Sequence, residues 1–103
     1  MDILELIDKS KSINSSLFSL QRILILKSLE DLEQDGAVYR QLKAVLGFED
    51  GSLFSSLKML EEMGFIKSKK INLENKKMTQ YFITEHGKKE FNLFKNWLKE
   101  VIK

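Results

Sequence analysis

The chain has 103 residues, is 43% hydrophobic and carries a formal net charge of +2, so one domain of this size can bury a core without covalent or metal staples. It contains no cysteine and a single histidine, His86. Disulfide frameworks, thiolate chemistry and histidine-rich metal sites are therefore excluded, and we expect no metal and no cofactor.

The charge is unevenly distributed along the chain. Residues 1–50 hold nine acidic and six basic side chains, whereas residues 51–103 hold six acidic and eleven basic ones. A polyanion, if one binds, is expected at the second half. The N-terminal residues do not resemble a secretory signal, and no apolar run approaches the roughly 20 residues of a membrane span, so we expect a cytoplasmic protein with no membrane partner.

The first half of the chain predicts three helices. Asp2 is expected to cap a helix that runs to about Lys11, with an apolar stripe formed by Ile3, Leu4 and Ile7, to which Leu6 could also belong. Ser19 is expected to cap a second helix that ends at Gly36. Its apolar residues leave little polar surface and predict a buried helix: Leu20, Ile23, Leu24, Leu26, Leu29 and Leu32. The inward side of a third, short helix, which ends at Gly47, is expected to comprise Leu42, Val45 and Leu46.

A fourth helix, expected over residues 52–63, has two different sides. Leu53, Leu57 and Leu60 recur at helical spacing and predict a side packed on the core. The remaining positions are small, polar or flexible, and they lie opposite or flank the helix: Gly51, Ser52, Ser55, Lys58 and Met59. Large apolar side chains on one side and small polar side chains on the other suit a helix that packs on its own domain and fits into a narrow groove of a partner.

From Phe65 the pattern changes to that of a β-hairpin with its tip near residues 72–77, because β-forming residues alternate with lysines. Thr84 is expected to cap a last helix. The apolar positions of that helix recur every three or four residues: Phe91, Phe94, Trp97 (or Leu98), Val101 and Ile102. The fold class is therefore mainly α with a small β-hairpin (α+β).

This order of elements predicts a winged helix-turn-helix. Two helices, at residues 39–46 and 52–63, are joined by the glycine-containing turn GFEDG and followed at once by a lysine-rich hairpin. We expect one domain over residues 1–103, made of an N-terminal helix and connection (1–18), a winged helix-turn-helix core (19–84) and a C-terminal helix (85–103). A helix that enters the major groove, which is about 12 Å wide, favours small hydroxylic and basic outer residues.

The chain resembles the minimal single-domain winged-helix transcriptional regulators of the MarR and ArsR type in archaea and bacteria, over roughly residues 17–95. The resemblance is carried by RILILKSL, by YRQLKAVLGFEDGSLFSSLKMLEEMGFIKSKK, and by TQYFITEHGKKEF with its T-x-x-G helix start. It implies that the second helix of the motif enters the major groove, that the hairpin wing touches the DNA backbone or the minor groove, and that the terminal helices form a homodimer.

The resemblance also implies roles for particular residues. Those expected on the groove or at phosphates of the second helix are Ser52, Ser55, Ser56, Lys58 and Met59. Arg40 and Lys43 are expected near phosphates. The wing residues are Lys69, Lys70, Lys76 and Lys77. The dimer interface is expected to comprise Ile3, Leu4, Ile7, Phe91, Phe94, Trp97, Leu98, Val101 and Ile102.

The reading helix departs from the family pattern because it has no Arg, Asn, His or Gln for bidentate recognition of a base. This favours shape readout or modest specificity, with lysine-phosphate contacts supplying most of the affinity. Phe54 is compatible with the core, an interface or contact with a thymine methyl group. Metal sensing of the ArsR type would need cysteine or clustered histidine ligands.

Each of these patterns also has a plainer explanation. The serines could form an ordinary solvated surface, the hairpin lysines, including Lys67, could protect an edge strand from aggregation, and Arg40 and Lys43 could simply be exposed. The terminal apolar residues could belong to the core alone, although two amphipathic helices exceed what one small core needs. His86 is expected to be a solvated residue at a helix start.

Two functions therefore remain open from the sequence. The first is a homodimeric transcriptional regulator that binds double-stranded DNA, with or without strong sequence specificity. The second is a winged-helix module that binds another protein and not DNA. No arrangement of Glu61, Glu62 or Glu85 suggests an acid–base pair, so we expect no enzymatic activity. No residue identifies a pocket for a small-molecule effector.

Overall fold

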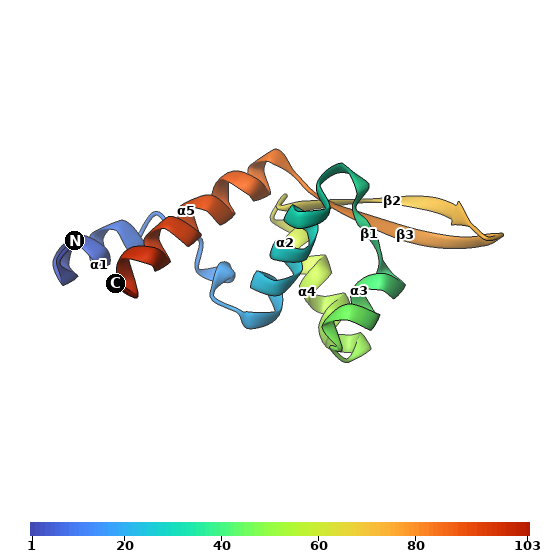
Figure 1. Ribbon diagram of the computed structural model, residues 1–103, viewed down its shortest axis with the longest axis horizontal. Helices are drawn as coiled ribbons and strands as arrows, with labels where there is room; N and C mark the ends of the chain where they lie inside the picture. Colours follow the sequence, from blue (N-terminus) through green and yellow to red (C-terminus); the bar gives the residue numbers. More distant parts are fainter.

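The computed structural model describes all residues 1–103 and contains five α-helices and three strands (Figure 1). The elements are α1 (Ile3–Ser10), η1 (Ser15–Leu17), α2 (Leu20–Leu32), η2 (Glu33–Asp35), β1 (Ala37–Val38), α3 (Tyr39–Leu46), α4 (Asp50–Glu62), β2 (Ile66–Leu73), β3 (Lys76–Ile83) and α5 (Glu85–Val101), where η1 and η2 are single turns of 3-10 helix. The predicted order of four helices, a hairpin and a fifth helix is confirmed, as is the fold class.

Three helices begin where the sequence predicts, each at a side chain that accepts a hydrogen bond from an otherwise unpaired backbone N–H group. Asp2 caps α1, Ser19 caps α2 and Thr84 caps α5. Helix α4 begins at Asp50, two residues before the expected start, so the turn between α3 and α4 comprises only residues 47–49. Gly47 ends α3 in the left-handed conformation, as its position predicts.

The three strands form an antiparallel sheet in the order β1-β3-β2. Strands β2 and β3 pair from Ile66 opposite Ile83 to Leu73 opposite Lys76, and the turn lies inside the predicted hairpin tip. Strand β1 was not predicted. It has only two residues, which pair with Tyr81 and Gln80 of β3, and a strand this short has no alternation to recognise.

The core lies where α2, α4, the sheet and the first half of α5 meet. Its fully buried side chains come from all four regions and from η1: Leu17, Ile25, Leu26, Leu29, Leu53, Leu57, Leu60, Phe65, Ile66 and Phe91. The predicted inward stripe of α4 is confirmed, because Leu53, Leu57 and Leu60 are each almost completely buried. Leu17 and Ile13, which lie in the segment that connects α1 and α2, also belong to the core.

Two expectations about burial were wrong. Helix α2 is not buried all round, since Leu20 is 71% exposed and Leu24 and Leu32 also reach the surface. Val45 of α3, expected to point inward, is 79% exposed. The other elements cover only one side of each helix, so part of each apolar surface is left facing solvent. Between these two helices runs a shallow apolar groove of about 360 Å³.

Helix α5 starts against the beginning of β2 through the T-x-x-G segment. The Thr84 hydroxyl donates to the Gly64 carbonyl oxygen at 2.6 Å and accepts from the Gly87 N–H group at 2.9 Å. A Cβ atom on Gly87 would lie 2.0 Å from the Phe65 carbonyl oxygen. Only glycine allows the two backbones to approach this closely, which gives the motif its physical reason.

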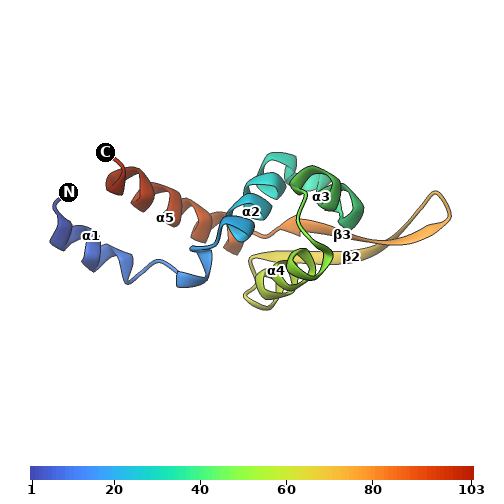
Figure 2. The same cartoon turned by 90° about the horizontal axis from the view of Figure 1, so that it is seen from below.

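The molecule is elongated, with extents of 55 × 26 × 22 Å. Helix α1 and the C-terminal part of α5 project from one end, and the β2–β3 hairpin projects from the other, with α2, α3 and α4 between them (Figures 1 and 2). Both chain termini therefore lie at the end opposite the hairpin. None of the helices combines the length and the apolar character that crossing a membrane would require.

Candidate nucleic-acid interface

The turn between α3 and α4 is fixed by side chains from both helices. The Tyr39 hydroxyl donates to Asp50 Oδ1 at 3.0 Å, and Lys43 Nζ donates to the Phe48 carbonyl oxygen at 2.7 Å. Lys43 Nζ also lies 3.5 Å from Asp50 Oδ1. Burial, followed by the hydrogen bond to Asp50, raises the pKa of Tyr39 above its ordinary value. These contacts hold α4 at a set angle to α3 and engage Lys43 within the protein.

The outer side of α4 is open to solvent and, apart from Phe54 and Met59, consists of small or polar residues. Ser52, Ser55 and Lys58 are exposed, as the sequence predicts, and Gly51 has no atom near the place where a Cβ would stand. Met59 is 40% exposed at one margin of this side. The opposite side of the helix holds the buried leucines, so α4 has the two-sided character expected of a helix that enters a groove.

Ser56 does not belong to this outer side. It is 7% exposed, and its hydroxyl donates to Gln21 Oε1 of α2 at 3.0 Å. The prediction that Ser56 contacts DNA was therefore wrong. The burial of Ser56 could have been predicted from the helical period. Ser56 follows Leu53 by three residues and precedes Leu60 by four, which places it within the buried stripe.

The hairpin lysines divide between two faces of the sheet. Ser68 donates to Glu61 Oε2 of α4 at 2.5 Å, so its face is the one that α4 covers. Strand alternation and the register place Lys70 and Lys77 on this face too. Lys67 and Lys69 lie on the opposite face, where Lys69 Nζ stands 5.2 Å from the centre of the Phe82 ring. Lys76 is on that face as well.

The positive charges around α4 are largely without acidic partners in the chain. Of the predicted DNA-contacting cations, Lys43 alone forms an ion pair, whereas Arg40, Lys58 and the wing lysines form none. Lys70 Nζ donates to Thr79 Oγ1 at 2.7 Å, a neutral partner that leaves its charge uncompensated. Glu61 and Glu62 stand at the C-terminal end of α4, and Asp50 in its first turn pairs with Lys43, so residues 51–60 between them carry no acidic side chain that would repel phosphate.

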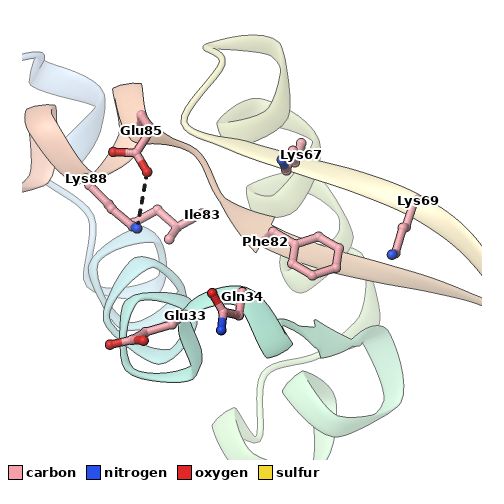
Figure 3. A pocket seen from close by; sticks show the side chains of 8 residues that line it. All are labelled: Glu33, Gln34, Lys67, Lys69, Phe82, Ile83, Glu85 and Lys88. Atoms are coloured by element: carbon pink, nitrogen blue, oxygen red, sulfur yellow. Dashed lines mark hydrogen bonds and ion pairs between the residues drawn. The ribbon is translucent and has the colours of Figure 1, made fainter.

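A hollow of about 400 Å³ opens on the face of the sheet opposite α4 (Figure 3). Its lining comes from η2, both hairpin strands and the start of α5: Glu33, Gln34, Lys67, Lys69, Phe82, Ile83, Glu85 and Lys88. Glu85 pairs with Lys88 at 3.4 Å, and Glu33 adds a further negative charge. The charge of the hollow is therefore mixed, unlike that of the surface beside α4.

The residues expected at a dimer interface occupy three environments. Ile3, Leu4 and Ile7 of α1 and Val101 and Ile102 at the end of the chain are exposed. Trp97 and Leu98 are half-buried against the core, and Trp97 Nε1 donates to the Leu6 carbonyl oxygen of α1 at 2.9 Å.

Phe91 and Phe94 are each 2% exposed within the single chain. Their expected place at a subunit surface was wrong, because the first half of α5 packs on the body of the protein and closes its core. Phe94 also meets the ring of Phe18 edge-on, with 5.2 Å between the ring centres.

The fold is that of a winged-helix protein. Helices α2, α3 and α4 are combined with a three-stranded sheet, and the lysines of the β2–β3 hairpin have no acidic partners in the chain. Residues 21–102 match the family model of the winged helix DNA-binding domain. The chain is 36% identical over 84 residues to an uncharacterized protein of Methanocaldococcus jannaschii, a match that covers 82% of this chain and 86% of the relative. The chain therefore belongs to the winged helix DNA-binding domain family.

Solved structures agree with this assignment. A transcriptional regulator homologue from Pyrococcus horikoshii OT3 superposes with a TM-score of 0.81 at 30% identity, over 97% of this chain and 95% of that one. MepR of S. aureus, solved in complex with DNA, shares the fold with a TM-score of 0.71 at 17% identity, over 97% of this chain and 81% of its own. The expected similarity to MarR-type regulators is confirmed, since MarR also has this fold.

Proposed function

We propose that the protein is a homodimeric transcriptional regulator in which α4 enters the major groove of double-stranded DNA and the β2–β3 hairpin contacts the backbone. One observation carries the proposal. In a chain of the winged helix DNA-binding domain family, the outer side of α4 is mostly small or polar, and the cations beside it other than Lys43 lack acidic partners. We propose no enzymatic step.

The N-terminal half of α4 suits the groove best. Ser52 and Ser55 can donate to or accept from base edges and phosphates, and their small size allows the helix backbone to come close. Lys58, one turn further along, adds a positive charge on the same side. Because hydroxyl groups discriminate weakly among bases, the sequence specificity that this surface supports is modest.

Most of the affinity would come from phosphate contacts. Arg40 on α3 and Lys70 and Lys77 on the α4-facing side of the hairpin are exposed cations that would flank a duplex in which α4 lies. Each phosphate neutralised by a protein cation releases counterions from the duplex, so binding should weaken steeply as salt increases.

The homodimer would form through the ends of the chain. Ile3, Leu4 and Ile7 project from α1 without a cover in the single chain, and Val101 and Ile102 extend the apolar surface at the end of α5. Exposed apolar groups on adjoining terminal helices are typical of a subunit interface. Two copies of α4 would then reach successive major grooves about 34 Å apart.

The test is fluorescence anisotropy of the purified protein with a labelled duplex over a salt series. We expect a steep salt dependence for the unaltered protein and a slope lower by about two for the variant Lys70→Ala/Lys77→Ala. The matched control, Lys89→Ala/Lys99→Ala, removes the same charge from exposed positions of α5. Equal slopes in the two variants would remove the hairpin from the interface.

A second pair of variants tests α4 itself. Ser55→Glu adds a negative charge to the outer side of the helix and should weaken DNA binding at least tenfold without lowering thermal stability. Asn92→Glu adds the same charge to an exposed position of α5 and should leave binding within a factor of two. Unchanged affinity in Ser55→Glu would show that α4 does not face DNA.

The alternative function is a module that holds a protein partner. The observation in its favour is the exposure of two large apolar side chains on α4, Phe54 at 59% and Met59 at 40%. The same anisotropy experiment separates the two functions. Absence of binding to any duplex at low salt would leave the protein-partner function as the better explanation.

A further inference from the structure

Phe54 is the large side chain of the outer half of α4 that the core does not use. It is 59% exposed, whereas the three leucines of the same helix are almost completely buried. It forms none of the aromatic pairs of the chain, which involve Phe18, Phe65, Phe91 and Phe94. An apolar ring left in water on a helix costs free energy, which contact with another apolar group would recover.

The position of Phe54 within α4 is as informative as its exposure. It is the fifth residue of the helix, in the N-terminal half that meets base edges when such a helix lies in the major groove. Ser55 follows it directly, and Lys58 lies one turn further along on the same side. Phe54 is therefore next to the polar groups that we propose contact DNA.

Helix α4 lacks the polar side chains that usually recognise bases, and a phenyl ring can recognise a base by apolar contact instead. The helix has no Arg, Asn, Gln or His, so it has no side chain that could form a bidentate hydrogen bond with guanine or adenine. The major groove also presents one apolar group, the 5-methyl group of thymine, and apolar side chains recognise it by contact. Phe54 is the large apolar residue of α4 best exposed for this contact.

We propose that Phe54 reads the 5-methyl group of thymine, so that the preferred sites of this protein carry thymine at one or two defined positions of the major groove. The inference rests on the proposed DNA binding and adds the group that α4 recognises. It assigns base selection to an apolar contact, and it assigns the remaining affinity to the cations of α3, α4 and the hairpin.

The experiment replaces thymine by deoxyuridine, which removes the methyl group and leaves the base-pairing hydrogen bonds unchanged. The duplex with the highest affinity is first selected from a random-sequence pool with the unaltered protein. It is then resynthesised with deoxyuridine at each thymine in turn, and binding is measured by anisotropy. We expect a threefold to fivefold loss of affinity at one or two positions and no change at the others, because one methyl group is buried at each contact.

The variant Phe54→Ala connects the loss to this side chain. It should bind the thymine duplex as weakly as the unaltered protein binds the deoxyuridine duplex, and it should no longer distinguish the two duplexes. The matched control is Met59→Ala, which shortens an exposed apolar residue at the other margin of the helix and should keep the distinction. Thermal unfolding of both variants verifies that the fold is intact.

The outcomes separate this inference from the proposed function. Salt-sensitive binding that is equally strong for thymine and deoxyuridine duplexes overturns the role of Phe54 and leaves DNA binding in place. Equal sensitivity in Phe54→Ala and the unaltered protein also overturns it, since the methyl group would then be read by another residue. Failure to bind any duplex overturns both proposals.

Discussion

Two regions of the molecule treat their apolar residues in opposite ways. In the winged-helix body, residues 19–84, the leucines of α4 and the central residues of α2 are buried within the chain. The terminal arm comprises α1 and residues 95–102, the last part of α5 with the residue that follows it. In this arm α1 has no buried residue, and Leu4 is 74% exposed. The helices of the body and those of the arm show the same apolar period. Periodicity therefore does not distinguish a helix side that is buried within the chain from one that is exposed to solvent.

The difference indicates what each region needs. The body closes its own core, with the first half of α5 as its last layer, whereas the arm is held by a few contacts such as the Trp97 hydrogen bond to α1. A partner copy over the arm would complete what the single chain leaves exposed. Five measurements test this difference between the body and the arm.

The largest effect is expected from Leu57→Ala in the body. Leu57 is 1% exposed, and removing three buried carbon atoms from α4 should lower the free energy of unfolding by about 2–5 kcal/mol. The same change at Leu4 of the arm should alter the unfolding of the body by less than about 0.5 kcal/mol. Chemical denaturation of both variants provides the comparison, and similar losses would show that the arm is part of the core.

Gly87→Ala tests the junction between the two regions. Its Cβ would lie 2.0 Å from the Phe65 carbonyl oxygen, so α5 must shift, at a cost of about 1–3 kcal/mol. Gly51→Ala places a methyl group where no atom lies within 4 Å and should stabilise the protein by about 0.5–1 kcal/mol. Opposite shifts in the unfolding midpoint are expected, and a neutral Gly87→Ala would contradict the close approach.

Replacing Ile3, Leu4 and Ile7 together by asparagine tests the proposed dimer. The dimer dissociation constant should rise at least tenfold, a change of about 1.4 kcal/mol, while the body remains folded. Sedimentation equilibrium measures the constant. The control, Leu20→Asn/Val45→Asn, makes polar two residues that are equally exposed but belong to the body. If only the control variant failed to dimerise, the subunit interface would lie on the exposed surfaces of α2 and α3 and not on α1.

Trp97→Phe should loosen the arm without affecting the body. The change removes the hydrogen bond from the indole Nε1 to the Leu6 carbonyl oxygen but keeps an aromatic ring beside Phe18. We expect a loss of about 1 kcal/mol, which is about fivefold faster hydrogen exchange of the α1 amides. The amides of α4 serve as the internal control, and faster exchange there would indicate a change in the body.

The smallest effect concerns the two tyrosines, both of which belong to the body. Burial, followed by the hydrogen bond to Asp50, raises the pKa of Tyr39, and burial, followed by the charge of Glu61, raises the pKa of Tyr81. An absorbance titration should show both ionising above the ordinary value of 10.0.

The linked effect on stability has a defined sign. Because the pKa of each tyrosine is higher in the folded chain, the contribution to stability is complete below pH 10 and is lost as pH rises through the folded pKa. Tyr39→Phe/Tyr81→Phe should unfold with a weaker pH dependence in this range. A variant as sensitive to alkaline pH as the unaltered protein would assign the effect to other groups.

Much of the fold could be predicted because its signals are local. Asp2, Ser19 and Thr84 cap helices in the structure as their positions suggest, and the leucine spacing of α4 correctly identifies its buried side. The two-residue strand β1 could not be predicted, since its pairing with β3 is a contact between residues more than forty positions apart.

The residues of the candidate interface also divide into those with a local sequence signal and those whose environment depends on tertiary contacts. Ser52, Ser55 and Lys58 are exposed as predicted, because α4 has one strongly apolar stripe that fixes its orientation. Lys43, which was expected near phosphates, closes the turn to α4 through the Phe48 carbonyl oxygen, a contact that no regular spacing in the sequence indicates. Phe54 could not be assigned from its position alone, and its exposure in the folded chain is what gives it a candidate role.

The order of the elements, the helix caps and the buried side of α4 follow from local sequence signals, since capping and helical period act within a few residues. Which apolar helix sides are covered depends on tertiary packing. Phe91 and Phe94 became core while Leu4, Leu20 and Val45 stayed exposed, although all five lie on apolar helix sides. Burial requires an opposing surface, and only the packing of distant segments determines where such a surface exists.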